Sequence, residues 1–163
     1  MQFTVHGDGV VSPISTRPPQ NVSEILLNIG CRTLSGNLLN AARKAFAHGY
    51  KVYILPNPYI IRTPDFIFEK KGTFRPYELK TISGKSSVSH RLEVSYGQSV
   101  RVLLNLTVDY NQSNLARCIK HYFEHSRNAL EVLIFKGKKS ISVSREMAQS
   151  KSFFSLFLKK YSK

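Results

Sequence analysis

Tryptophan is missing from this chain of 163 residues, cysteine occurs only twice, and acidic residues number only 10. Long apolar runs are missing too: no stretch approaches the roughly 18 apolar residues that a membrane-spanning helix needs, so we expect no membrane segment. The first residues, MQFTVHGDGVV, lack a basic start followed by an apolar stretch, which argues against a secretory signal. Cys31 and Cys118 show neither metal-site nor redox spacing, so free thiols in a reducing compartment are the preferred interpretation and a disulfide is the alternative.

The shortage of acids leaves the chain strongly basic. Lys and Arg number 24, the formal net charge is +14, and the pI is near 10.0. Such a charge attracts polyanions, chiefly nucleic acid or an anionic membrane surface. Membrane binding favours one long basic amphipathic helix, whereas the cations here are spread along the chain. The composition therefore favours nucleic acid, and a basic surface that serves only solubility is the plain alternative.

Length and composition predict one domain over 1–163, because a hydrophobic fraction of 42% is ordinary for a globular protein. Residues 1–20, with several glycines and prolines, predict a loosely ordered or edge-forming lead-in, and the core of the domain is expected over 21–163. Ser35 is expected to cap a helix that runs to about His48. The other expected elements are helices over 21–29, 114–126 and 153–161, strands over 50–55, 65–70, 73–82 and 102–106, a loop over 83–89, and a final hairpin over 130–144.

This order of elements predicts an α/β protein, of the α+β kind with a mixed sheet, in which a three-strand antiparallel meander is flanked by helices. Lys71-Gly72 has the composition of a two-residue hairpin turn between the second and third strands. Pro76 interrupts the third strand and predicts a bend or bulge there.

Three polar residues of the meander carry a specific chemical prediction. Glu78 and Lys80 are two apart on a strand and so face the same side. With a two-residue turn at 71–72, counting back along the hairpin places Asp65 opposite Glu78, with Cβ atoms about 5 Å apart. Adjacent carboxylates repel unless a cation lies between them, and Mg²⁺ suits that position beside a substrate phosphate. Such an ion polarises a phosphoryl oxygen and helps to generate hydroxide, and Lys80 could orient or deprotonate the attacking water or neutralise the transition state. The alternative is a solvated charge pattern on a surface hairpin.

Pro64-Asp65, followed along the chain by Glu78-Leu79-Lys80, resembles the PD-(D/E)xK motif of nucleases with a restriction-endonuclease-like core. The pattern over roughly 35–135 also resembles the toxin nuclease domain at the C-terminus of contact-dependent growth inhibition proteins. The resemblance implies an endonuclease in which Asp65 and Glu78 bind a divalent metal, Mg²⁺ first with Mn²⁺ or Zn²⁺ as alternatives, and Lys80 is catalytic. It also implies RNA, tRNA in particular, as substrate, action in the cytoplasm of a cell into which the toxin is delivered, and a cognate immunity protein as partner.

The sequence departs from this family at one point. Relatives often carry a metal-supporting glutamate on the helix before the meander, whereas the matching turn here offers Asn37 and Asn40, with Glu24 further upstream. Either Glu24 completes the site, or the metal relies on two carboxylates and carbonyls. Hydroxyl, amide and cationic side chains near the centre are candidates for contact with the nucleic acid: Lys85, Ser87, Arg91, Gln98 and Arg101.

Weaker signals have plain explanations. His121 and His125 are one helical turn apart, but Tyr122 stands where the zinc-protease motif needs glutamate, so we expect ordinary surface histidines. Tyr59 and Tyr77 are the nearest candidates for stacking on unpaired bases.

The rival functions are a DNA endonuclease of a mobile element with the same centre, a basic nucleic-acid-binding domain without catalysis, and a scaffold for an acidic protein.

Overall fold

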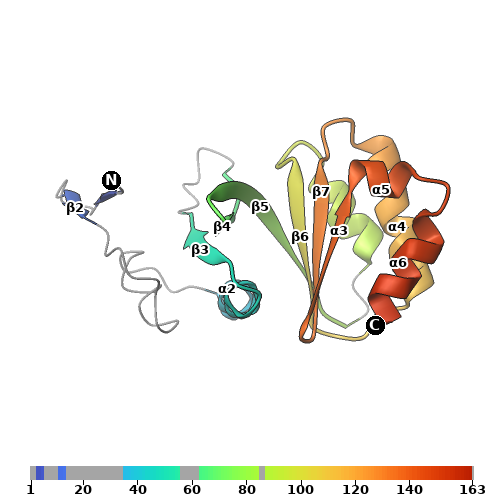
Figure 1. Ribbon diagram of the computed structural model, residues 1–163, viewed down its shortest axis with the longest axis horizontal. Helices are drawn as coiled ribbons and strands as arrows, with labels where there is room; N and C mark the ends of the chain where they lie inside the picture. Colours follow the sequence, from blue (N-terminus) through green and yellow to red (C-terminus); the bar gives the residue numbers. More distant parts are fainter. Residues whose placement is uncertain (1–2, 6–10, 14–34, 56–62, 85–86, 163) are drawn as a thin grey trace.

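The computed structural model describes residues 3–5, 11–13, 35–55, 63–84 and 87–162. This part of the chain is an α/β protein with a six-stranded mixed sheet and five helices (Figure 1). A separate two-stranded sheet pairs β1 (Phe3–Val5) with β2 (Val11–Pro13), within the lead-in expected over 1–20. The helix expected over 21–29 lies outside the described residues. None of the described helices is both long enough and apolar enough to cross a membrane.

The large sheet has the strand order β3-β4-β5-β6-β7-β8. Its first half is the expected antiparallel meander of β3 (Lys51–Ile54), β4 (Phe66–Lys70) and β5 (Thr73–Ile82). In its second half, β6 (Arg101–Leu106) and β7 (Glu131–Lys136) run parallel to β5, and β8 (Lys139–Ser144) returns antiparallel to β7. The helices are α2 (Gly36–Ala47), α3 (Val88–Val94), α4 (Gln112–His125), α5 (Arg145–Gln149) and α6 (Phe153–Ser162).

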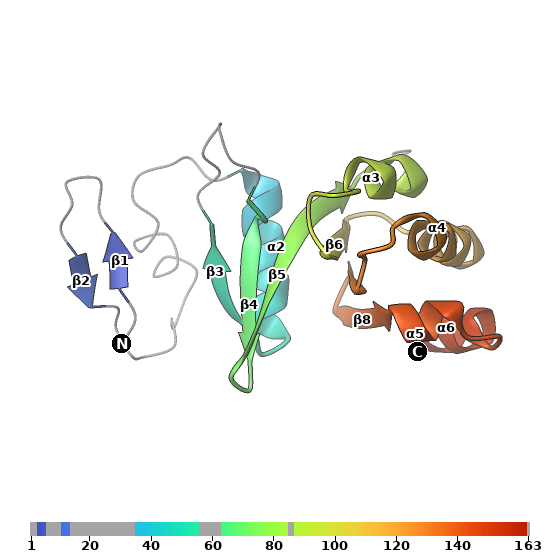
Figure 2. The ribbon, with the colours of Figure 1, turned by 90° about the horizontal axis from the view of Figure 1, so that it is seen from above.

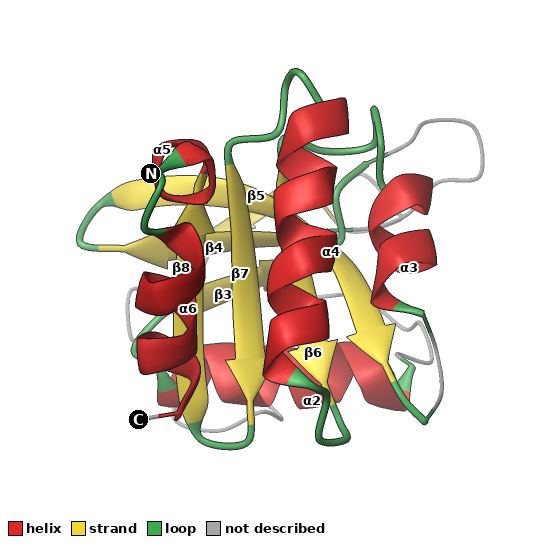
Figure 3. Cartoon of the chain, turned by 90° about the vertical axis from the view of Figure 1, so that its right-hand side faces the viewer, coloured by secondary structure: helices red, strands yellow, loops and turns green. Residues whose placement is uncertain are grey.

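The helices cover the two faces of the sheet. α2 packs Ala41, Ala42 and Ala45 against Phe66 and Phe68 on one face, because the small alanine side chains let the helix approach the aromatic rings closely. On the other face, α3, α4 and α6 lie over the half that contains β6, β7 and β8 (Figure 3). Burying one such phenylalanine contributes roughly 2–3 kcal/mol. The two cores thus lie on opposite faces of the sheet, and β5, β6 and β7 contribute side chains to both of them.

The hairpin between β4 and β5 has the register that the sequence predicts. Lys71 and Gly72 both have positive φ, 52° and 76°, as a two-residue turn that matches the twist of the strands requires. The pairing runs without interruption from Lys70 opposite Thr73 to Phe66 opposite Tyr77. The strand confirms the predicted range of 73–82.

The expected bulge at Pro76 is wrong, because Pro76 pairs with Ile67 in the regular register. Antiparallel pairs alternate between bonded and non-bonded, and counting from the turn puts Pro76 in a non-bonded pair, so β4 requires no N–H from it. On the other edge of β5, pairing with β6 begins only at Glu78. Proline therefore lies where neither neighbour needs a donor.

Two short helices are absent from the sequence prediction. α3 (Val88–Val94) begins inside the loop expected over 83–89, directly after its N-cap Ser87. Only Val88 and Leu92 of this helix are buried, one turn apart. α5 follows β8 directly, capped by Ser144, and has five residues. Helices of this length carry too few apolar positions to show a period in the sequence.

Candidate active site

Asp65 and β5 are joined where the β4–β5 ladder ends. Asp65 is the residue before β4, and its carboxylate Oδ2 accepts a hydrogen bond of 2.8 Å from the backbone N–H of Leu79. In a regular ladder that N–H would reach the carbonyl of Pro64, at the next bonded position beyond Phe66. The carboxylate of Asp65 replaces that carbonyl as the acceptor, at the point where the chain leaves the sheet. The backbone of Asp65 is fixed on its other side, since its carbonyl accepts from the N–H of Leu55 at 3.0 Å.

Glu78 and Lys80 form an ion pair on the same face of β5. The Nζ of Lys80 lies 2.8 Å from Oε1 of Glu78, and the two side chains are only 11% and 14% exposed. The same Nζ donates to Oε1 of Gln98 at 2.9 Å. Gln98 follows α3 in a turn that Gly97 closes with a φ of 73°. The ammonium is therefore held by two acceptors from different elements, in a partly buried position.

Burial raises the pKa of Asp65 above its ordinary value. The hydrogen bond from the Leu79 N–H opposes this effect, the charge of Glu78 adds to it, and the charge of Lys80 lowers the pKa again. The three groups thus interact electrostatically, which agrees with the convergence that the register predicts. Two carboxylates held together in a desolvated place favour a bound cation.

A cavity of about 260 Å³ lies beside this group. Asp65 and Lys80 contribute to its wall, together with the first turn of α2 and with Arg91 of α3. The described residues that line it are Asn37, Leu38, Asp65, Leu79, Lys80, Thr81 and Arg91. The predicted candidates Asn37 and Arg91 therefore line the same cavity as the centre, although they are far from each other in the sequence.

Other predicted contact residues lie elsewhere. Ser87 accepts a hydrogen bond from the His90 N–H as the N-cap of α3. Arg101 begins β6 on the opposite face of the sheet from Lys80, and its Nε lies 3.5 Å from Oε2 of Glu131. The structure therefore brings Gln98 and Arg91 to the centre and leaves Arg101 away from it. Lys85 and Glu24, like the stacking candidate Tyr59, lie outside the described residues.

Tyr77 is not available for stacking on bases. Its ring is 1% exposed, and its hydroxyl donates to Oε2 of Glu131 at 2.9 Å. Glu131 is itself buried and also accepts from Ser142 at 2.6 Å, while Arg75 lies 3.4 Å away. Alternation along β5 signals this outcome, because Tyr77 faces the side opposite to Glu78.

The predicted alternative ligand Asn40 has a structural partner. Its Oδ1 accepts a hydrogen bond of 3.0 Å from the amide of Asn105, which is fully buried on β6. Oδ1 of Asn105 in turn accepts from Lys44 at 2.7 Å. This pair of contacts ties α2 to the sheet next to the cavity. Asn37, rather than Asn40, is the asparagine that reaches the cavity.

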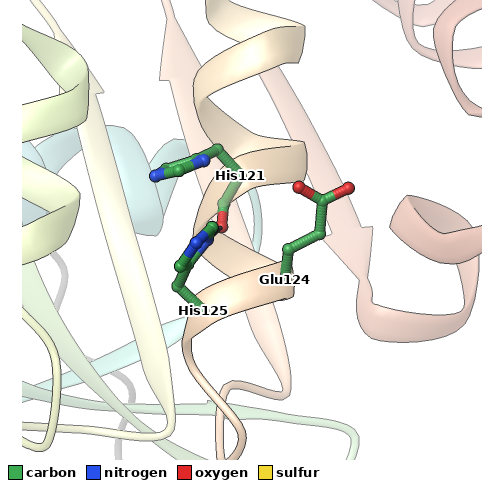
Figure 4. Close-up of side chains that lie close together, drawn as sticks. All are labelled: His121, Glu124 and His125. Carbon is green, nitrogen blue, oxygen red and sulfur yellow. Dashed lines mark hydrogen bonds between the residues drawn. The ribbon is translucent and has the colours of Figure 1, made fainter.

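Among the described residues, one group of three side chains has the ligand types and spacing for a metal: His121, Glu124 and His125, whose ligand atoms lie within 4.8 Å of one another. Figure 4 shows these side chains on the surface of α4. All three are exposed, and Nδ1 of His125 is 2.9 Å from the carbonyl of His121. Exposed groups of this kind are common without a metal, so the trio is no evidence for a metal centre.

The donor set of Asp65 and Glu78 fits a hard divalent cation. Mg²⁺ typically takes one or two protein carboxylates, and water and substrate phosphate complete its shell. The hydrogen bonds described above involve Oδ2 of Asp65 and Oε1 of Glu78, so the second oxygen of each carboxylate would serve as ligand. Lys80 neutralises part of the negative charge in the meantime.

Comparisons of the chain with protein-family models, with curated proteins and with solved structures find no match.

Proposed function

We propose that this protein is a metal-dependent endonuclease of the PD-(D/E)xK kind, with a restriction-endonuclease-like core, that hydrolyses phosphodiester bonds. The observation that carries the proposal is the convergence of Asp65, Glu78 and Lys80 at the end of the β4–β5 ladder, beside a cavity. The three-strand meander flanked by α2 and α3 supports it, as does the net charge of +14, which favours a polyanionic substrate.

Each residue has a role that follows from its place. Asp65 and Glu78 would hold the cation, which supplies Lewis-acid activation of the phosphate and of a water when bound. Lys80 would release Glu78 when the cation binds, so that its ammonium could orient the attacking water or neutralise charge on the phosphate. Gln98 would keep that ammonium in place during the exchange. Arg91, at the cavity wall, would hold a phosphate next to the one that is cut.

RNA, with tRNA first, is the proposed substrate, and this choice follows from the resemblance to the toxin domains of contact-dependent growth inhibition proteins. The same resemblance supports delivery into the cytoplasm of a neighbouring cell and control by a cognate immunity protein. Charge alone does not separate RNA from DNA, because both present phosphate.

The test is a cleavage assay on total RNA, purified tRNA and plasmid DNA, each with Mg²⁺ and with EDTA. We expect new RNA ends only with Mg²⁺, and loss of cleavage in Asp65→Asn, Glu78→Gln and Lys80→Ala. Glu124→Gln is the matched control, since it neutralises an exposed glutamate in the other group of metal-ligand type. If only plasmid is cleaved, the substrate is DNA and not RNA. If nucleic acid is bound tightly but never cleaved, the protein is a non-catalytic nucleic-acid-binding domain. If Glu124→Gln loses as much cleavage activity as Glu78→Gln, the metal site lies on α4 and not at the proposed centre.

A further inference from the structure

The face of the meander that carries Glu78 also carries an exposed aromatic pair. Phe74 of β5 is 53% exposed, although it is a large apolar side chain on a central strand. The ring of Tyr53, on β3, lies 6.1 Å from the ring of Phe74 between centroids. β4 runs between their strands, so the two rings meet above it. We call the surface formed by Tyr53, Ile67, Phe74 and Pro76 the aromatic platform.

Register shows that the platform and the centre are continuous. Phe74, Pro76, Glu78 and Lys80 alternate along β5 and share one face. Ile67 pairs with both Tyr53 and Pro76, so these three side chains form one row across the strands. The position of Asp65 and Glu78 is the next row on that face, about 7 Å further along. A ligand that lies along the face would pass from the aromatic rings directly to the two carboxylates.

The described helices leave this part of the sheet uncovered. α2 packs on the opposite face, against Phe66, Phe68 and Tyr77. The buried cluster under α3, α4 and α6 takes no residue from β3 or β4. Figure 2 shows the same division, with α2 beside β4 and β5 and the other helices gathered around the second half of the sheet. Ile67, Pro76 and Tyr53 are accordingly only partly buried.

The rows of the platform carry no net negative charge that would repel an anionic strand. Their acid, Glu69, is nearly buried and paired with Lys51 at 3.0 Å. Lys80 and Arg91 follow at the end of the face where the cavity lies. Aromatic rings on an open sheet stack on unpaired bases, while neighbouring cations hold the phosphates. Bases within a duplex cannot reach such rings, because they are already stacked on one another.

We infer that the aromatic platform binds an unpaired stretch of the nucleic acid and feeds it to the centre, with bases stacked on Tyr53 and Phe74. The inference rests on the proposed function and narrows its substrate class to loops, ends and other single-stranded segments. It also replaces the buried Tyr77 as a stacking residue. The sequence identifies these stacking residues only when the strand register is known, because the register decides which aromatic side chains share the face of Glu78.

The test measures binding in EDTA, so that no cleavage is required. Fluorescence anisotropy with a labelled short single-stranded RNA and with the same strand annealed to its complement gives the two affinities. We expect tighter binding of the single strand, and a loss of about tenfold or more in Phe74→Ala and in Tyr53→Ala for the single strand alone. Phe74→Trp should restore the affinity. Phe46→Ala is the matched control, because Phe46 is a phenylalanine that is 40% exposed on α2.

A second measurement guards against misfolded variants. Photocross-linking of the wild type to a strand that contains thiouridine, followed by mass spectrometry, should place adducts on β3 and β5 at the platform. The inference is overturned by unchanged single-strand affinity in both alanine variants, by an equal loss for the duplex, or by a dimer of the wild type that Phe74→Ala dissociates. Cleavage by Lys80→Ala at the wild-type rate would instead refute the proposed function. The binding data in EDTA would still show whether the aromatic platform binds single-stranded nucleic acid.

Discussion

Lys80→Ala is the substitution whose effect on stability can be worked out most fully. The ammonium of Lys80 is nearly buried and donates to Glu78 at 2.8 Å and to Gln98 at 2.9 Å. Without it, Glu78 would keep its charge in a place that is 14% exposed, with Asp65 close by. Removing one partner of a fully buried ion pair costs about 3–5 kcal/mol. Because this pair keeps some solvent access, we expect a loss below that range, about 2–3 kcal/mol.

A divalent metal should return part of that stability. Lys80 and the cation compete for Glu78, so the variant should bind Mg²⁺ more tightly than the wild type does. A tenfold excess of Mg²⁺ over its dissociation constant adds about 1.4 kcal/mol to the free energy of unfolding. The variant should nevertheless cleave at least about 100-fold more slowly, because it lacks the group proposed to act on the water or the phosphate.

Urea denaturation of both proteins, in EDTA and over a series of Mg²⁺ concentrations, measures these differences. Lys71→Ala, at the exposed turn of the hairpin, is the control for loss of one positive charge. The reasoning is refuted if Lys80→Ala loses less stability than Lys71→Ala, or if Mg²⁺ stabilises the variant and the wild type equally.

Two further predictions concern buried acids. Because burial and Glu78 raise the pKa of Asp65 in the metal-free protein, protons should compete with Mg²⁺ for this carboxylate at a higher pH than for an ordinary aspartate, so cleavage at limiting Mg²⁺ should fall at that higher pH on acidification. In EDTA, the folded state binds the extra proton in the window between the ordinary and the raised pKa, so stability should decrease as the pH rises through it. A pH–rate profile and urea titrations across that window, with Asp65→Asn as the form that lacks the decrease, check both effects. Glu131→Ala should lower the free energy of unfolding by about 3 kcal/mol, since Tyr77, Ser142 and two arginines would lose a buried acceptor. The more exposed Arg75→Ala should cost less in the same denaturation experiment, and the reverse order would contradict the role given to Glu131.

The sequence predicts the elements with strong local signals. Ser35 caps α2 as expected, and the Lys71-Gly72 turn fixes the register that brings Asp65 to Leu79, at the end of the β4–β5 ladder. These signals act over a few residues and so can be read without the rest of the protein. α3 and α5 depend instead on one or two buried contacts each, which become visible only once the sheet exists.

The residues around the candidate centre are harder to predict from the sequence than Asp65, Glu78 and Lys80 themselves. Gln98 reaches Lys80 because α3 and its turn fold back over β5. Arg101 follows Gln98 closely in the sequence, but strand alternation turns it towards Glu131 on the other face. The exposure of Phe74 depends on which helix covers which half of the sheet, and no local pattern records that choice.

β5 changes partners at the candidate centre. It pairs with β4 in opposite direction up to Tyr77, and from Glu78 onward it runs alongside β6. Glu78 and Lys80 therefore stand on backbone that is anchored at its edge by an adjoining strand, and the Leu79 amide between them is also claimed by Asp65. Because this backbone is already ordered in the folded protein, the groups on it lose little conformational entropy when a ligand binds.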